Sequence, residues 1–485
     1  MNCVFITIFN QENYVNMSYL LLESIFIYGN LQNTTKILIY TSTPFMNKIK
    51  QSHLFDDRVI DFEINDNYNN IDKACKARLD IFNLKSISNY SKILYLDTDI
   101  IIKDNLHKIF DICEEDILYV LEEGTIDDQA DYWGRTLFGN EIDNYTDKTA
   151  FTSGILLFNN CPKVKELFEK IKEDIINRQS QLSFFDQPFI VYNAFKYNLY
   201  NNKQLISFAV NNDTNIHSDK IIHHFPGTPG YYNVKISKMT LFLKELKDFG
   251  IAQNIVKTKK YIDDHLLPII TECGELLEGN IFMLHNTTNY TDVFLNKTKN
   301  ISNLVLNKNI KNVMEIGFNS GFSTLLMLFT NLELRVTCFD LGEHKYTMPC
   351  YEKMKETFGD RINIIIGDSA KTLQNVSDIY DLIHIDGGHS TECANNDIIN
   401  SYKLSKHGTI IIMDDYDFPN LYHLWNSYII KYNLKPLDIN TYDSQHHDIK
   451  YVCLDKMENT PSTVSTPSTV EINWTNISID RVMTL

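Results

Sequence analysis

Residues Ser91–Asp104 read SKILYLDTDIIIKD. The apolar run predicts a buried strand, and it ends on two carboxylates, Asp97 and Asp99, separated by one residue. Because alternate residues of an extended chain project to the same face, both carboxylates can lie on one side at the end of that strand. Paired buried charges are costly without a cation, and oxygen ligands suit Mg²⁺ or Mn²⁺. The plainer alternative is an acidic turn after a strand.

The length and charge of the chain limit the classes of protein to which it can belong. At 485 residues it exceeds one comfortable core, which predicts two or three domains. The net charge of −17 argues against a nucleic-acid partner, because binding phosphates needs a basic face. Nine scattered cysteines without a Cys-x-x-Cys pair predict reduced thiols and a cytoplasmic location. We expect no signal peptide and no membrane span, since no run approaches the roughly 18 apolar residues of a membrane helix.

The first half of the chain alternates predicted strands and helices around the opening stretch. Strands are expected at Val4–Phe9, Lys36–Thr41 and Val59–Phe62, and helices at Met17–Tyr28 and Asp72–Lys85. This alternation is typical of an α/β sheet, in which ligands bind at the carboxyl ends of the strands. Asp97 and Asp99 follow such an end, which strengthens the interpretation as a metal pair.

The order of motifs in this half resembles the retaining glycosyltransferases of family 8, the glycogenin type. The motifs that carry the resemblance are Tyr14 in a polar loop, Arg78 on a helix, Leu96-Asp97-Thr98-Asp99, Phe151-Thr-Ser-Gly154, Phe185-Asp186-Gln187 and His224-Phe-Pro-Gly227. The resemblance implies a GT-A-type nucleotide-sugar domain. It also implies a Mn²⁺ ion, a UDP-sugar donor and retention of configuration at the transferred sugar.

The resemblance assigns a role to each of these residues. Mn²⁺ would be ligated by Asp97, Asp99 and His224. Asp186 and Gln187 would be the catalytic groups that stabilise an oxocarbenium-like transition state. The nucleotide-sugar would be bound by Tyr14, which would stack on the uracil, and by Arg78, Ser153, Gly154 and Gly227.

Plainer alternatives exist for several of these motifs. They are a bulge at Ser153-Gly154, a helix N-cap at Asp186 and a satisfied core histidine at His224. The chain also departs from the family pattern after Gly227, where it reads Thr-Pro-Gly. Many relatives have a Lys-Pro-Trp run there, which grips the diphosphate of the donor. Arg78 or Lys76 is the candidate replacement.

The segment between the two halves has a different character. Helices are expected at Met239–Leu246 and Asp248–Leu267, and no long Gly/Pro/Ser linker is present. This composition predicts a packed helical connector that caps the part that follows. The predicted divisions are a glycosyltransferase domain at 1–245, the connector at 246–300, a methyltransferase domain at 301–456 and a flexible Ser/Thr/Pro tail at 457–485.

The second half repeats the pattern of strands that end in acids. Strands are expected at Asn312–Gly317, Arg335–Asp340, Ile362–Gly367, Tyr380–Ile385 and Thr409–Met413, with a final antiparallel pair near 436–440 and 450–454. A glycine-bearing turn follows the first strand, and Asp340 comes about 20 residues later, a spacing that places a carboxylate on a ribose. An NAD-binding domain would show the same spacing, but its turn reads Gly-x-Gly-x-x-Gly.

The motifs of this half resemble class I methyltransferases that bind S-adenosylmethionine. Glu315-Ile-Gly-Phe-Asn-Ser-Gly-Phe-Ser323 is similar to their first motif. Ile385-Asp-Gly-Gly-His-Ser390 and Asp414-Asp415-Tyr416 are similar to the metal-dependent sugar O-methyltransferases. The resemblance implies a Rossmann-like, seven-stranded domain that uses S-adenosylmethionine and Mg²⁺.

This second resemblance also assigns roles. S-adenosylmethionine would be bound by Glu315, Gly317, Gly321, Ser323, Asp340, Asp368 and Ser369. Mg²⁺ would be ligated by Asp386, Asp414 and Asp415. His389 would be the general base, since a metal-bound sugar hydroxyl can lose its proton to a nearby imidazole.

The two halves together predict a bifunctional enzyme of glycan building. It would transfer a sugar to a glycan or glycoprotein acceptor and methylate a sugar hydroxyl. One alternative is that only the methyltransferase is active and the first domain is a nucleotide-sugar or glycan-binding module. Another is that the methyltransferase acts on a non-sugar small molecule or a protein. A homo-oligomer is left open. The Asn- and Ile-rich fusion resembles those of large DNA viruses, which would make the cytoplasm that of a host.

Overall fold

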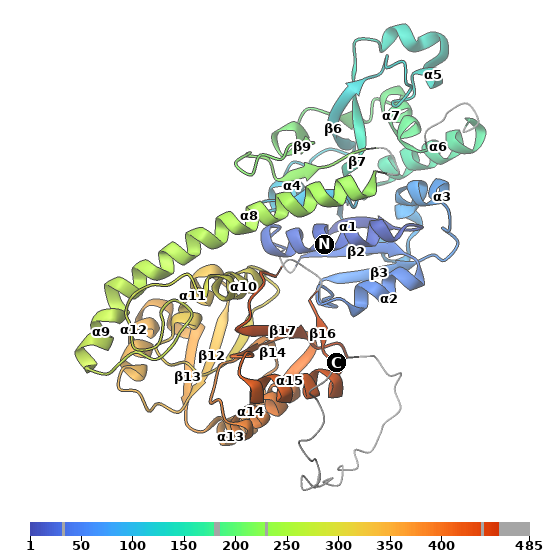
Figure 1. Cartoon of the computed structure of the whole chain (residues 1–485). Helices are drawn as coiled ribbons and strands as arrows, with labels where there is room; N and C mark the ends of the chain where they lie inside the picture. The colour runs from blue at the N-terminus through green and yellow to red at the C-terminus, as the bar shows by residue number, and fades with distance from the viewer. Residues whose placement is uncertain (32–33, 179–184, 228–230, 438–440, 455–485) are drawn as a thin grey trace, which may run out of the picture. The chain divides into compact units, whose positions relative to one another are not determined.

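The computed structural model describes residues 1–31, 34–178, 185–227, 231–437 and 441–454. These residues form two seven-stranded sheets and one three-stranded sheet, with helices between the strands (Figure 1). The predicted α/β class is confirmed. The predicted tail at 457–485 lies outside the described residues.

The first sheet has the strand order β3-β2-β1-β4-β7-β6-β8. Its strands are β1 (Asn2–Ile8), β2 (Thr35–Thr41), β3 (Ile60–Ile64), β4 (Lys92–Leu96), β6 (Leu118–Thr125), β7 (Thr149–Asn159) and β8 (Tyr200–Asn201). The four strands β3, β2, β1 and β4 run parallel, and β7 pairs antiparallel with β4. Central strands are apolar on both faces because helices cover both sides. The parallel core places the ends of β1 and β4 at one edge.

The helices of this half follow the strands closely. They are α1 (Glu12–Tyr28), α2 (Thr43–Gln51), α3 (Ile71–Lys76), α4 (His107–Asp111), α5 (Arg135–Phe138), α6 (Pro162–Arg178) and α7 (Gln187–Lys196). The predicted helix at Asp72–Lys85 is α3 followed by a 3₁₀ segment, Ala77–Asn83.

The opening stretch divides between two sheets. β4 ends at Leu96, the carboxylate pair lies in a turn, and β5 (Ile100–Ile102) begins a three-stranded sheet with β10 (Ile222–His224) and β9 (Ala209–Asn211). β5 and β10 are antiparallel, and His224 lies opposite Ile100 in their register. This pairing brings His224 beside the turn that carries Asp97 and Asp99.

The connector is dominated by one long helix, α8 (Tyr232–Tyr261), drawn in green in Figure 1. A π-helical turn, Ile262–Leu266, and α9 (Leu267–Cys273) continue it, and α10 (Leu295–Val305) follows. The prediction of two separate helices was wrong. No proline interrupts α8, and Lys247, at the predicted break, is buried in an ion pair with Glu23 of α1, 2.7 Å away. The predicted boundary at residue 245 falls inside α8.

The second seven-stranded sheet has the order β13-β12-β11-β14-β15-β17-β16. Its strands are β11 (Asn312–Ile316), β12 (Arg335–Asp340), β13 (Ile362–Ile366), β14 (Tyr380–Ile385), β15 (Ser405–Asp414), β16 (Lys435–Pro436) and β17 (His447–Tyr451). Five strands are parallel, and β17 pairs antiparallel with β15 and β16. The predicted seven-stranded, Rossmann-like sheet is confirmed, and the final pair begins slightly earlier than expected.

The helices that cover the second sheet lie between its strands. They are α11 (Phe322–Thr330), α12 (Thr347–Phe358), α13 (Ser369–Thr372), α14 (Thr391–Lys403) and α15 (Pro419–Lys431). Within the described ranges, no helix combines the length and the apolar character needed to cross a membrane.

Candidate active sites

A cavity of about 430 Å³ lies where β1 and β4 end. Every residue that the sequence assigned to the first site lines it, namely Tyr14, Arg78, Asp97, Asp99, Ser153, Gly154, Asp186, Gln187, His224 and Gly227. Further lining residues that the sequence did not single out include Glu123, Tyr132, Trp133 and Lys235. The fold therefore gathers six motifs that are separate in the sequence around one cavity.

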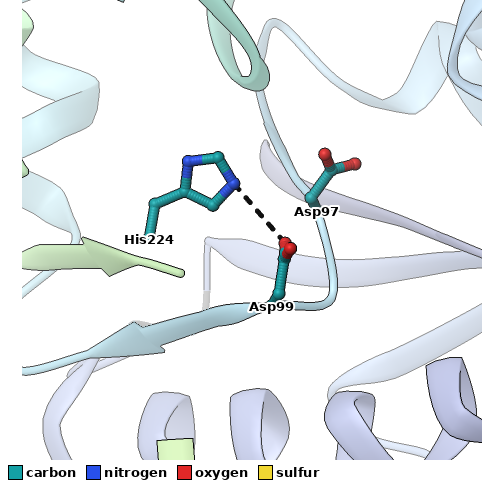
Figure 2. Close-up of side chains that lie close together, drawn as sticks. All are labelled: Asp97, Asp99 and His224. Carbon is teal, nitrogen blue, oxygen red and sulfur yellow. Dashed lines mark ion pairs between the residues drawn. The ribbon is translucent and has the colours of Figure 1, made fainter. Parts of the chain in front are cut away.

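Asp97, Asp99 and His224 form a compact cluster within this cavity. Their ligand atoms all lie within 4.8 Å of one another. Figure 2 shows the His224 ring directed at Asp99, and His224 Nε2 is 3.5 Å from Asp99 Oδ1. His224 Nδ1 lies 2.8 Å from the side-chain oxygen of Asn211. A hydrogen bond from Nδ1–H to that oxygen leaves the lone pair of Nε2 facing the carboxylates.

The cluster fits a divalent cation. Two carboxylates and one imidazole are a suitable ligand set for Mn²⁺. Gly154 keeps the space open, because a Cβ there would come within 2.7 Å of the His224 ring and 3.0 Å of the Asp97 carboxylate. Any larger residue at position 154 would displace a ligand.

Arg78 is held by protein groups on several sides. Its guanidinium donates to the Ser153 carbonyl oxygen at 2.6 Å and lies 3.3 Å from Asp97 and 3.0 Å from Asp186. Lys76, the other candidate for the donor's diphosphate, pairs with Asp72 at 2.6 Å. Arg78 therefore organises the acidic side chains of the cavity.

Asp186 and Gln187 stand at the start of α7. Burial raises the pKa of Asp186 to about 6, although the nearby Arg78 charge opposes this rise. Asp186 does occupy the N-cap position of α7, as the plainer alternative has it, but its side chain accepts no hydrogen bond from the helix. Gln187 Oε1 accepts the backbone N–H of Ser153 at 3.0 Å, which ties α7 to β7.

A second cluster lies where β14 and β15 end. The ligand atoms of His384, Asp386 and Asp414 are within 4.8 Å of one another. The sequence assigned Asp415 to this set, but in the structure its Oδ2 lies 2.6 Å from Nε2 of His389. His384 was missed, although it stands two residues before Asp386 and so projects to the same side of β14.

His384 bridges two buried carboxylates. Its Nδ1 is 2.9 Å from Glu315 Oε1, and its Nε2 is 3.1 Å from Asp414 Oδ2. Burial lowers the pKa of His384, but the hydrogen bonds to Asp414 and Glu315 outweigh burial and raise it to about 10. The Glu315 side chain is fully buried and contacts His384. The sequence had instead assigned Glu315 to the binding of S-adenosylmethionine.

A lysine from α10 completes this second cluster. Lys297 Nζ is 2.5 Å from Asp414 Oδ2, and the lysine side chain is 7% exposed. Burial alone would lower the pKa of Lys297. The negative charge of Asp414, with smaller contributions from neighbouring acids, outweighs burial and raises this pKa above its ordinary value. Burial and the Asp414 charge together raise the pKa of Asp386 to about 8. The carboxylate oxygens suit Mg²⁺, and Lys297 already compensates part of their charge.

The glycine turn after β11 has the features of a ligand site. Asp340 Oδ2 accepts the backbone N–H groups of Phe318 and Asn319, each at 2.8 Å, and thereby shapes the turn. Ser320 Oγ and Asn319 Oδ1 are buried and have no hydrogen-bond partner among the described residues. Such orphaned polar atoms fit a polar ligand such as S-adenosylmethionine.

Three glycines of the second half have packing roles. Gly317 has φ +93°, and a Cβ there would lie 1.9 Å from the Asp386 carbonyl oxygen. A Cβ at Gly321, whose φ is +78°, would strike the Phe318 ring. Gly387 faces Asp397, because a Cβ at Gly387 would be 3.0 Å from Asp397 Oδ2. The turn therefore needs glycine for its own geometry, whatever ligand it binds.

The remaining predicted residues lie around this turn. Ser323 is buried in the first turn of α11. Asp368 caps α13 by accepting the backbone N–H of Ala370 at 3.0 Å. Ser369 Oγ donates to Asp397 Oδ1 at 2.7 Å. Both Asp368 and Ser369 thus follow β13, at the same edge of the sheet as the glycine turn.

Asp397 yields a prediction about stability and pH. Burial raises its pKa to about 6, above the value of about 4 in an unfolded chain. The folded state therefore favours the protonated form, and the stability present below about pH 4 is lost as the pH rises through about 6. We expect Asp397→Asn to raise the free energy of unfolding at pH 8 by about 2 kcal/mol and to give no gain at pH 4.

Thermal and denaturant unfolding at both pH values would measure this effect. Asp378→Asn is the matched control, because Asp378 is exposed and the substitution changes the net charge equally. An equal gain for Asp397→Asn at both pH values would contradict the assignment to this carboxyl group.

Each half of the chain contains a segment that matches the model of a known protein family. Residues 18–205 match the model described as glycosyl transferase family 8, and residues 314–416 match the model of a methyltransferase domain. A search of curated proteins found no match.

Three similar solved structures illustrate the two halves. A galactosyltransferase in complex with donor and acceptor sugar analogues is 17% identical, with a TM-score of 0.38, covering 51% of this chain and 96% of its own. Mouse xyloside xylosyltransferase 1 is 12% identical, with a TM-score of 0.36, covering 46% and 98%. A TDP-rhamnose 3′-O-methyltransferase of calicheamicin biosynthesis is 15% identical, with a TM-score of 0.27, covering 33% and 78%. The two family matches show that this chain joins a family 8 glycosyltransferase domain to a methyltransferase domain on one polypeptide.

Proposed function

We propose that the first domain transfers a sugar from a UDP-sugar to a glycan or glycoprotein acceptor, with Mn²⁺ and with retention. The second domain methylates a sugar hydroxyl with S-adenosylmethionine and Mg²⁺. The observation that carries the first assignment is the Asp97–Asp99–His224 cluster, which lies in one cavity with all the other predicted donor and catalytic residues. The divisions at 1–245, 246–300 and 301–456 remain our proposal for the domains.

The groups around the first cluster suit sugar transfer. Asp97, Asp99 and His224 would hold the cation, which supplies Lewis acidity toward a diphosphate leaving group. Asp186 lines the same cavity. Its pKa is raised to about 6, so its carboxyl group is mostly ionised at pH 7. Its negative charge, with the amide oxygen of Gln187, would stabilise positive charge at the anomeric carbon. Arg78 fixes the position of Asp186 by its contact at 3.0 Å.

The groups around the second cluster suit deprotonation of a sugar hydroxyl. His389 is half-exposed beside Asp386, Asp414 and Asp415, and its hydrogen bond with Asp415 raises its pKa. Asp415 therefore orients the imidazole and stabilises the imidazolium formed when His389 accepts a proton. His384 is tied to two carboxylates at both nitrogens, so it serves to place Asp414. In-line positioning of the methyl donor and the sugar hydroxyl would supply most of the remaining rate acceleration.

We also propose that the methyltransferase acts on the sugar that the first domain has just added. Both sites are on one chain, and tethering raises the effective concentration of the product of one site near the other. The proposal predicts that glycosylated acceptor is methylated faster than the same free acceptor. If an unrelated free acceptor were methylated as fast as the glycosylated acceptor, the coupling would be contradicted.

A donor screen tests the proposed function directly. Purified protein is incubated with a panel of UDP-sugars and acceptors, with Mn²⁺ or after chelation, and released UDP is measured. We expect release with one donor class, loss of release after chelation and recovery when Mn²⁺ is restored. Binding of a UDP-sugar without turnover for any donor would favour a nucleotide-sugar-binding module.

A further inference from the structure

A lysine of α8 reaches into the donor cavity. Lys235 Nζ is 2.6 Å from Asp99 Oδ2, and the lysine side chain is 14% exposed. Among the described residues that line the cavity, the lysines and arginines are Arg78 and Lys235. Lys235 lies outside the segment 18–205 that matches the glycosyltransferase family model. The first turn of α8 therefore contributes a positively charged side chain to the cavity, beside His224 and Gly227, which also lie outside that segment.

The two cations of the cavity differ in how firmly they are held. Arg78 is buried between two carboxylates and a backbone carbonyl group. Lys235 is paired with Asp99, which is itself a proposed ligand of the divalent cation. A divalent cation on Asp99 would repel the lysine ammonium at this distance. The flexible stem of Lys235 allows its Nζ to move to another anion in the cavity, whereas the guanidinium of Arg78 stays in place.

The surroundings of Lys235 leave room for such an anion. Gly227 faces its stem, because a Cβ at Gly227 would lie 3.3 Å from Lys235 Cε. One turn earlier on α8, the Tyr232 ring packs edge-on against Tyr14, with centroids 5.4 Å apart. Tyr14 is the residue expected to stack on the nucleoside base. The first turn of α8 therefore contacts both the proposed base site and the proposed cation site.

We propose that Lys235 binds the diphosphate of the nucleotide donor, and that it exchanges Asp99 for that diphosphate when the divalent cation binds. Charge explains the exchange. The divalent cation binds the Asp99 carboxylate, and the diphosphate then becomes the anion that pairs with the Lys235 ammonium. This inference rests on the proposed use of a nucleoside-diphosphate donor. It gives this chain a diphosphate-binding lysine, although the sequence Thr228-Pro-Gly230 directly after Gly227 contains none.

Calorimetric binding of UDP and of uridine, both with Mn²⁺, tests the inference. We compare the unchanged protein with Lys235→Ala, Lys235→Arg and the control Lys238→Ala, which removes an exposed lysine from the same helix. Losing a charge-assisted hydrogen bond should weaken UDP binding about 10- to 100-fold in Lys235→Ala. Uridine, which has no phosphate, should bind both proteins equally, and Lys235→Arg should retain part of the affinity for UDP.

Direct titration with Mn²⁺ in the absence of nucleotide provides a second readout. Because Lys235 competes with the cation for Asp99, Lys235→Ala should bind Mn²⁺ several-fold more tightly while it binds UDP more weakly. A merely structural role would weaken both. Equal UDP binding by Lys235→Ala and the unchanged protein would overturn the inference alone. Failure of the unchanged protein to bind UDP at all would overturn the proposed donor and the inference together.

Discussion

Asp97→Asn should reduce sugar transfer by about a thousand-fold and leave methylation of a preformed glycoside unchanged. The substitution keeps the shape of the side chain but removes one of the two carboxylate charges in the first cluster. A cation that stabilises a leaving diphosphate contributes several kcal/mol to the transition state, and each 1.36 kcal/mol is about tenfold in rate. Released UDP and transfer of labelled methyl groups measure the two activities in the same preparation.

The control for this experiment is Asp104→Asn. Asp104 belongs to the same stretch of sequence but is exposed and pairs with Lys108 on the surface, so its loss should leave both activities unchanged. If Asp97→Asn also stopped methylation of the preformed glycoside, the interpretation of two independent sites would be wrong. Loss of activity caused by unfolding would appear as a lower melting temperature, which Asp104→Asn should not show.

Asp414→Asn should abolish methyl transfer and destabilise the protein, while sugar transfer persists at temperatures where the fold is intact. Asp414 is fully buried and contacts both Lys297 at 2.5 Å and His384 at 3.1 Å. Removing one partner of a buried ion pair leaves the other charge uncompensated, which typically costs about 3 to 5 kcal/mol. Thermal unfolding and labelled-methyl transfer measure the two effects separately.

A double variant separates the structural role of Asp414 from its chemical role. Asp414→Asn combined with Lys297→Met removes the uncompensated ammonium, so we expect part of the lost stability to return without methyl transfer. Asp417→Asn is the matched control, because Asp417 is an exposed acid three residues away. Retained methyl transfer in Asp414→Asn would contradict a role for Asp414 at the proposed Mg²⁺ site.

The sequence by itself predicted the class of fold, and its resemblance to family 8 named residues that line the first cavity. Buried parallel strands are continuous apolar runs, and such runs are local features that need no knowledge of the rest of the chain. The acids and glycines that follow these runs lie at strand ends, and ends of parallel strands share one edge of a sheet. That rule pointed to Asp97 and Asp99, whereas Asp186 and His224 were named by the resemblance to family 8 glycosyltransferases.

The tertiary structure alone decided which charged groups pair inside the two clusters. Lys235 meets Asp99 because α8 packs on α1 and begins at Tyr232, seven residues before the predicted start at Met239. Lys297 meets Asp414 because α10 lies beside the end of β15. No periodicity distinguishes these lysines from the solvated lysines around them. Their burial comes from the docking of a whole helix, and docking depends on contacts between residues that are far apart in the chain.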